Sequence, residues 1–208
     1  IDVVHNFICP KHFDRPADLE FRQQLSPSGA PILCHISNFR PVKRVMDAVE
    51  VFARVRKQRQ CTLLMVGDGP ERAGAEAKCR SLGIADDVVF LGKVKNPIEP
   101  LLIADLLMLP SETESFGLVA LEAMAAGVPV ISSNVGGLPE VNVQGESGML
   151  REVGDVVGMA EDALVMLADE HLSLFKSRAK NRANAFTIDR ILPQYLEVYR
   201  KALNAEES

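Results

Sequence analysis

The chain has 208 residues, a mass of 22.7 kDa and a formal net charge of −5, from 23 Lys and Arg against 28 Asp and Glu. Apolar residues make up 47% and charged residues 25%, which excludes disordered, collagen-like and coiled-coil chains. Nucleic acid is not expected as a partner, because its binders normally carry a basic excess. The longest apolar run, residues 101–109, is too short for a membrane helix and contains Asp105. Integral membrane insertion is therefore not expected, whereas peripheral membrane contact and the oligomeric state are left open.

The cysteines and histidines indicate no metal site. The four cysteines lie at positions 9, 34, 61 and 79, with no C-x-x-C pair among them. We expect free thiols in a reducing cytosol, and hence a cytoplasmic protein. His35 lies in an apolar run and is expected to be a core histidine whose hydrogen bonds are satisfied. Asp-x-Asp, which often holds a metal-bound diphosphate, is absent, so neither a metal nor another cofactor is expected.

From residue 31 onward, short β-rich runs alternate with longer helical patterns. Compact apolar runs predict strands at 32–36, 61–66, 88–91, 106–109, 128–133 and, more weakly, 149–153. Apolar residues spaced three and four apart predict helices between them at about 42–55, 71–82, 97–104 and 117–126. No strand is expected after about residue 153. Instead we expect a helix at 156–169, a second helix that ends at about residue 184, and a final helix in the C-terminal region.

Strands that are apolar on both faces and separated by helices predict an α/β fold. We expect a Rossmann-like, doubly wound parallel sheet with helices on both faces, followed by C-terminal helices. In such sheets the ligand lies beyond the carboxyl ends of the strands, where the chain order reverses. The loops that follow the strands are therefore the candidate sites. They are residues 37–43, 67–71, 92–97, 110–117 and 134–140.

Two glutamates flank the start of the helix predicted at 117–126. Glu114 stands just before this helix and Glu122 about one turn inside it, with seven residues between them. Free N–H groups at residues 116–118 and the positive end of the helix dipole would bind an anion there. Carboxylates accept hydrogen bonds from sugar hydroxyls, so the pattern favours a ligand with central phosphates and flanking hydroxyls. Alternatively, Glu114 caps the helix and Glu122 lies on a solvated face, although an apolar run surrounds Glu122 and makes an unpaired charge costly.

The loop after the first predicted strand is basic. It carries Arg40, Lys43 and Arg44 at a strand-to-helix junction, where such side chains pair with phosphate. A merely solvated loop is the alternative. The glycine pairs at 67/69 and 136/137 follow two other strands and, taken alone, indicate tight turns.

Several segments match one known family. They are Glu114-Ser-Phe-Gly-Leu-Val-Ala-Leu-Glu122, Val66-Gly-Asp-Gly-Pro70, Phe90-Leu-Gly92, Gly127-Val-Pro-Val-Ile131 and Gly136-Gly-Leu-Pro-Glu140. Over essentially its whole length, the chain resembles the C-terminal, donor-binding half of a GT-B glycosyltransferase of family 4, whose signature is Glu-x7-Glu. The resemblance implies an interdomain linker at 1–15, a nucleotide-sugar-binding domain at 16–185, and a C-terminal helix at 186–208 that packs on an N-terminal domain absent here.

The resemblance also implies roles for individual residues. Glu114 would hold hydroxyls of the donor sugar, and Glu122 the ribose hydroxyls of the nucleotide. Backbone N–H groups of Phe116, Gly117 and Leu118 would hold the diphosphate. The donor-binding residues implied in addition are Asn38, Gly67, Ser115 and, for the base (usually uracil), the backbone around Lys93 and Val94.

The predicted catalytic residues are Arg40, Lys43 and Glu114, with no metal. Lys43 matches the family's diphosphate-binding lysine. The position of the family's arginine is occupied by Asn38, with Arg40 two residues further on, and we favour Arg40 for this role. The implied reaction is transfer with retention of configuration, in which the basic loop and the helix end stabilise the charge of the departing diphosphate.

Within the family, residues 35–44 are most similar to enzymes of bacillithiol synthesis that transfer N-acetylglucosamine to L-malate. This implies UDP-N-acetylglucosamine as donor and L-malate as a small acceptor bound by the missing N-terminal domain. Because the usual catalytic histidine also belongs to that domain, the isolated chain is expected to bind donor weakly and to be inactive.

Two other functions remain open. One is half of a UDP-N-acetylglucosamine 2-epimerase, which binds the same nucleotide sugar. The other is a non-catalytic nucleotide-binding module, such as a flavodoxin-like receiver. A receiver needs an acidic cluster after the first strand, where this chain has Asn38, Arg40 and Lys43.

Overall fold

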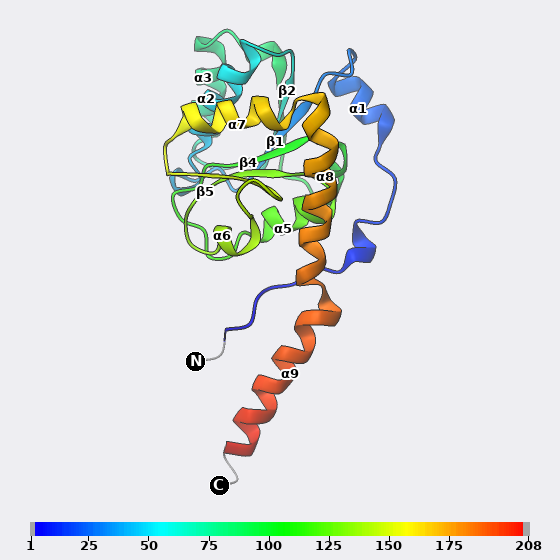
Figure 1. Ribbon diagram of the computed structural model, residues 1–208. Coiled ribbons are helices and arrows are strands. Elements are labelled where there is room, and N and C mark those ends of the chain that lie inside the picture. Colours follow the sequence, from blue (N-terminus) through cyan, green and yellow to red (C-terminus); the bar gives the residue numbers. More distant parts are fainter. Residues whose placement is uncertain (1–2, 206–208) are drawn as a thin grey trace.

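The computed structural model describes residues 3–205, which form a six-stranded parallel sheet with helices on both faces (Figure 1). The strands are β1 (Ile32–Ile36), β2 (Thr62–Val66), β3 (Val88–Gly92), β4 (Leu106–Leu109), β5 (Val130–Ser133) and β6 (Gly148–Arg151). Their order is β3-β2-β1-β4-β5-β6, and all neighbours are parallel. This order confirms the predicted Rossmann-like sheet. The chain order reverses between β1 and β4, which places the crevice for a ligand at their carboxyl ends.

The helices largely follow the predicted pattern. They are α1 (Leu19–Leu25), α2 (Val45–Arg56), α3 (Arg72–Ser81), α4 (Ile98–Ile103), α5 (Leu118–Ala125), α6 (Leu138–Val141), α7 (Val156–Met166), α8 (Asp169–Ala183) and α9 (Ile188–Ala205). Helices α2, α3 and α7 cover one face of the sheet, and α4, α5 and α8 cover the other. No helix within residues 3–205 is long and apolar enough to cross a bilayer.

Three local features differ from the expected pattern. Helix α1 was not predicted, and α6 begins within residues 136–140, directly after the predicted turn at Gly136 and Gly137. The helix expected from residue 42 begins at Val45, after a short 3-10 turn at Pro41–Lys43. Arg44 separates the two because it adopts a left-handed conformation with φ of 48°, which a continuous α-helix cannot contain.

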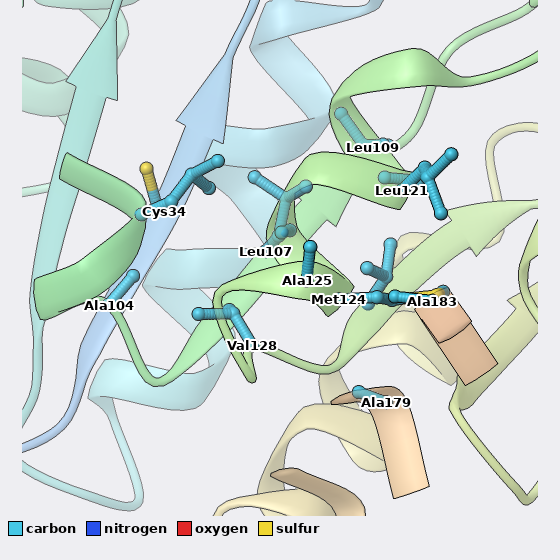
Figure 2. Close-up of a cluster of buried hydrophobic side chains, with 14 of the residues drawn as sticks. Cys34, Ala104, Leu107, Leu109, Leu121, Met124, Ala125, Val128, Ala179 and Ala183 are labelled. Atoms are coloured by element: carbon cyan, nitrogen blue, oxygen red, sulfur yellow. The ribbon is translucent and has the colours of Figure 1, made fainter. Parts of the chain in front are cut away.

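Both faces of the sheet are buried, as the apolar strands predicted. Along β4, Leu107 and Leu109 face the side of α5 and α8, whereas Leu106 and Met108 face the side of α2 and α7. Figure 2 shows the first side, where small residues of α8 approach α5 and the strands. The labelled side chains there include Cys34, Leu107, Leu121, Met124, Ala179 and Ala183. The sheet is therefore a rigid platform from which the loops project.

The segments that lead to the two ends of the described region pair with each other at Ile8 and residues 186–188. Ile8 donates its N–H to the Phe186 carbonyl (2.9 Å) and accepts the N–H of Ile188 (3.0 Å). Beyond this crossing α9 extends away from the rest of the molecule (Figure 1), with Tyr199 63% and Leu203 66% exposed. Residues 1–2 of the predicted linker and 206–208 of the predicted C-terminal helix lie outside the described residues.

Candidate nucleotide-sugar site

A crevice opens at the carboxyl ends of β1 and β4, where the sheet topology places a ligand. It consists of two adjoining hollows of about 360 and 370 Å³. Both hollows are lined by the shared residues Ile36, Ser37, Asn38 and Pro97. A crevice with two joined compartments suits an elongated ligand better than a compact one.

The structure brings most of the predicted site residues to this crevice. Lys43, Glu114, Leu118 and Glu122 line the first hollow. The second is lined by Gly67, Lys93 and Val94, and Asn38 lines both. The basic loop, the two glutamates and the loop after β3 thus meet although they are far apart in sequence.

Four predicted site residues line neither hollow: Arg40, Ser115, Phe116 and Gly117. Arg40 and Ser115 are exposed, whereas Phe116 and Gly117 are buried, so that for the last two only the backbone is a candidate for ligand contact. Asn38, in contrast to Arg40, lines both hollows. The role predicted for Arg40 therefore has less geometric support than that of Lys43.

Lys43 and Glu114 form an ion pair within the first hollow. Lys43 Nζ lies 2.6 Å from Glu114 Oε2, and the side chains are only 21% and 16% exposed. The predicted phosphate-binding cation and the predicted sugar-binding carboxylate are therefore direct partners in the structure. Each of the two charges neutralises the other.

Glu122 differs from Glu114 in having no partner. Among the described residues no hydrogen bond or ion pair reaches its carboxylate, which lines the first hollow. Burial raises the pKa of Glu122 above its ordinary value. A partly buried carboxylate with free acceptor positions is suited to hydrogen-bond donors such as the two hydroxyls of a ribose.

The N-terminus of α5 lies beside these carboxylates, and its first residue, Leu118, lines the first hollow. Within residues 3–205, the N–H groups of Phe116, Gly117 and Leu118 have no hydrogen-bond acceptor. Gly117 has φ of 87°, which lets the chain turn sharply into the helix. Such free N–H groups at the positive end of a helix form an anion site.

The glycine pairs seen in the sequence bring neighbouring loops close to the site. A Cβ atom on Gly67 would lie 1.8 Å from the Ser37 carbonyl oxygen, and one on Gly136 would lie 1.8 Å from that of Glu114. Both residues also have positive φ, at 123° and 52°. The tight turns that the sequence indicated therefore pack the loops after β2 and β5 against the two loops of the crevice.

A buried histidine holds the basic loop in place. His35 Nδ1 donates to the Met108 carbonyl (2.9 Å), so Nε2 must accept the hydroxyl of Ser37 (2.9 Å). Burial and the nearby charge of Lys43 lower the pKa of His35 to about 4, against the opposing hydrogen bond to Met108. Ser37 Oγ in turn accepts the N–H of Phe39, which is buried in a left-handed conformation with φ of 40°. The expectation of a satisfied core histidine is confirmed, and this neutral ring positions the loop.

Two serines of the crevice were not singled out from the sequence. Ser37 directly follows β1 and Ser111 lies two residues after β4, and both line the first hollow. The Ser111 hydroxyl is buried and has no hydrogen-bond partner among the described residues. Their place after parallel strands was the available signal, because ligands bind beyond the carboxyl ends of such strands.

The comparisons with known proteins agree with this geometry. The family model described as glycosyl transferases group 1 matches residues 17–187. The chain belongs to this family. Its six-stranded parallel sheet is thus the Rossmann-like fold of a glycosyltransferase domain, and its structural neighbours are GT-B glycosyltransferases.

Individual relatives of this glycosyltransferase domain cover the chain almost completely. An N-acetyl-alpha-D-glucosaminyl L-malate synthase from Bacillus anthracis is 41% identical over 211 residues, covering all of this chain and 55% of the relative. A 2-deoxystreptamine glucosyltransferase from Streptomyces kanamyceticus is 31% identical and covers 99% of this chain and 56% of the relative. The chain therefore spans about half the length of these curated relatives.

Solved glycosyltransferase structures superpose closely on the domain. HepE from Anabaena, crystallised in complex with UDP and glucose, has a TM-score of 0.86 at 26% identity, covering 96% of this chain and 57% of its own. Sucrose-phosphate synthase from Thermosynechococcus elongatus has a TM-score of 0.87 at 28% identity, covering 98% and 53%. The first of these is a relative whose crystals hold a nucleotide and a sugar.

Proposed function

We propose that this chain is the donor-binding half of a retaining, metal-independent glycosyltransferase whose donor is UDP-N-acetylglucosamine. The observation that carries the proposal is the meeting of four features in one crevice. They are the unpartnered Glu122, the Lys43–Glu114 pair, the open N-terminus of α5, and the second hollow beside Lys93 and Val94. Together they match a ligand with a base, a ribose, a diphosphate and a sugar in that order.

Each part of the donor has a complementary group in the crevice. The backbone around Lys93 and Val94 would contact uracil, and Glu122 would accept the ribose hydroxyls. The α5 N–H groups and Lys43 would hold the diphosphate, and Glu114 the sugar hydroxyls. The structure of HepE with UDP and glucose supports this ligand class.

The same groups account for the chemistry that we propose. When the bond between the sugar and the diphosphate breaks, negative charge grows on the leaving phosphate. Lys43 and the positive end of α5 lie where they can stabilise that charge, which is the task that a bound metal performs in other transferases. Asn38 lines the crevice and can donate a hydrogen bond, whereas Arg40 would have to swing inward to contribute.

The identity of donor and acceptor rests on the relatives. The 41% identity to an N-acetyl-alpha-D-glucosaminyl L-malate synthase supports N-acetylglucosamine as the transferred sugar and L-malate as the acceptor. We propose that the acceptor binds to the part of such an enzyme that lies outside these 208 residues. A cytoplasmic location belongs to the same proposal and is supported by four free thiols, three of them buried.

Calorimetric titration of the chain with UDP, UDP-glucose and UDP-N-acetylglucosamine tests the proposed donor. We expect weak binding of all three, strongest for UDP-N-acetylglucosamine, and no turnover with L-malate by these residues alone. Equal affinity for UDP-glucose and UDP-N-acetylglucosamine would contradict the assigned donor. A lack of UDP binding would contradict the proposed site. Formation of the 2-epimer without acceptor by the full-length enzyme would favour the epimerase alternative instead.

A further inference from the structure

The Lys43–Glu114 pair joins two residues that the donor would separate. The two side chains share a 2.6 Å contact and are partly buried in the first hollow. Under the proposed function, Lys43 pairs with the diphosphate and Glu114 with the sugar. The same two charges thus pair with each other in the structure and would take different partners with the donor bound.

We propose that this ion pair makes the crevice discriminate the intact nucleotide sugar from the free nucleoside diphosphate. The pair is exchanged for ligand contacts when the donor binds, and it re-forms as the spent nucleotide leaves. This inference rests on the proposed function and concerns the same crevice. It adds a specificity-determining role for the contact between Lys43 and Glu114.

The free nucleotide and the nucleotide sugar offer different groups to Glu114. A diphosphate draws Lys43 toward itself and weakens its contact with Glu114, because it carries more negative charge than one carboxylate. With UDP alone, Glu114 is then left partly buried, unpaired and next to an anion, which is costly. With a nucleotide sugar, the sugar hydroxyls donate hydrogen bonds to Glu114 and replace those of Lys43.

Glu122 provides the internal contrast. Among the described residues its carboxylate has no hydrogen-bond or ion-pair partner, so a ligand has no ion pair to break there. Its ribose contacts are common to UDP and UDP-sugar, and they cannot distinguish the two. Discrimination therefore resides at Glu114, whose carboxylate opposes UDP and favours the sugar.

The decisive experiment is calorimetry of UDP and UDP-N-acetylglucosamine with the Glu114→Gln variant. Glutamine keeps the shape of the side chain but releases Lys43 and removes the repulsion of phosphate. We expect UDP to bind up to about fivefold more tightly than to the wild type, which is the upper end of the coupling measured for a partly exposed ion pair. The ratio of UDP-N-acetylglucosamine affinity to UDP affinity should fall about tenfold or more, since charged hydrogen bonds to the sugar are lost.

Glu112→Gln is the matched control. Glu112 is exposed and lines neither hollow, yet its substitution changes the net charge by the same amount. We expect unchanged affinity for both ligands. If Glu114→Gln leaves UDP affinity unchanged or lowers it, or if Glu112→Gln raises it equally, the inference is overturned.

A double-variant cycle separates failure of this inference from failure of the proposed function. Lys43→Met should weaken UDP binding more in the Glu114→Gln background than in the wild type, because only in the wild type must Lys43 give up a partner. Equal effects in both backgrounds would overturn the exchange while leaving the donor site intact. If neither Lys43→Met nor Glu122→Gln changes UDP affinity, the proposed function itself fails.

Discussion

The buried carboxylates at the two ends of the sheet differ in the number of their hydrogen-bond and ion-pair partners. At the amino end, Asp105 is 4% exposed and is fully paired. It lies 2.6 Å from Lys176 and 2.8 Å from Arg22, and it accepts the Ile32 N–H at 2.9 Å. At the carboxyl end, Glu122 is partly buried with no partner within the described chain, and Glu114 has a single partner.

Their pKa shifts reflect this difference. Burial alone would raise the pKa of Asp105, but the charge of Lys176 and hydrogen bonds from Lys176, Ile32 and Arg22 lower it overall. For Glu122 burial acts unopposed and raises the pKa. A buried carboxylate that has all its hydrogen-bond and ion-pair partners stabilises the fold. One that lacks such partners is available to a ligand. The comparison thus separates a structural charge cluster from a binding site within one sheet.

Removing Asp105 should have the largest effect on stability. Asp105→Ala leaves Lys176 and Arg22 without their carboxylate and the Ile32 N–H without an acceptor, so we expect unfolding to require about 3–5 kcal/mol less free energy. UDP affinity at the far end of the sheet should not change under conditions where the variant is folded. Urea denaturation and calorimetry measure the two quantities. A loss of less than 1 kcal/mol would show that the cluster is not structural.

Glu122→Gln should have the opposite effects, a loss of UDP affinity without a loss of stability. Loss of the charged acceptor for the ribose hydroxyls is expected to weaken UDP binding by about 1.5–3 kcal/mol, roughly tenfold to a hundredfold, and UDP-sugars by the same factor. At neutral pH the variant should be at least as stable as the wild type, because a partly buried, unpaired charge is removed. The same titration and denaturation experiments apply. A variant that is less stable but binds UDP normally would place Glu122 among structural residues.

Ser37→Ala tests the support of the basic loop. It removes the hydroxyl that joins His35 to the Phe39 N–H, and we expect a loss of about 1–2 kcal/mol in stability. UDP binding should weaken by severalfold, since the loop also carries Asn38 and Lys43. Ser37→Thr, which keeps the hydroxyl, is the control and should restore both properties. Weakened binding in both variants would mean that the side chain acts by steric fit.

The strands and the two glutamates could be predicted because their signals are local. Apolar runs mark buried strands wherever they occur, and Glu114 and Glu122 are separated by a fixed number of residues around one helix start. Helix α1 could not be recognised, since none of its side chains is fully buried and only Phe21 and Leu25 pack against the core. Instead, the Asp18 side chain caps it at the Phe21 N–H, and Arg22 ties it to Asp105, a residue far away in the sequence.

The contacts inside the site could not be predicted from the sequence either, because they join residues that are far apart along the chain. Lys43 and Glu114 are 71 residues apart, and only the register of β1 and β4 brings their loops together. The left-handed turn at Arg44, stabilised by its bond to Asp47, displaced the start of α2 and set the position of Lys43. The residue types alone indicated a cation and a carboxylate suited to a nucleotide sugar. That Lys43 and Glu114 form an ion pair depends on the folded positions of their loops.

The smallest expected effect is the pH dependence that Glu122 gives to UDP binding. Its pKa is raised in the free protein, and hydrogen bonds from ribose favour the ionised form, so binding releases its proton below that pKa. UDP affinity should therefore fall as the pH is lowered from neutral through the raised pKa. The stability of the fold changes with pH in the opposite direction. Because the folded chain holds this proton more tightly than the unfolded chain, the contribution of Glu122 to the free energy of unfolding is lost as the pH rises through its pKa in the folded chain. Because UDP itself titrates, the measured quantity is the difference between wild type and Glu122→Gln in calorimetry at several pH values. If that difference stays constant from pH 7 to below the ordinary glutamate pKa, Glu122 does not bind as a carboxylate, and its lack of a partner has no part in recognising the ribose.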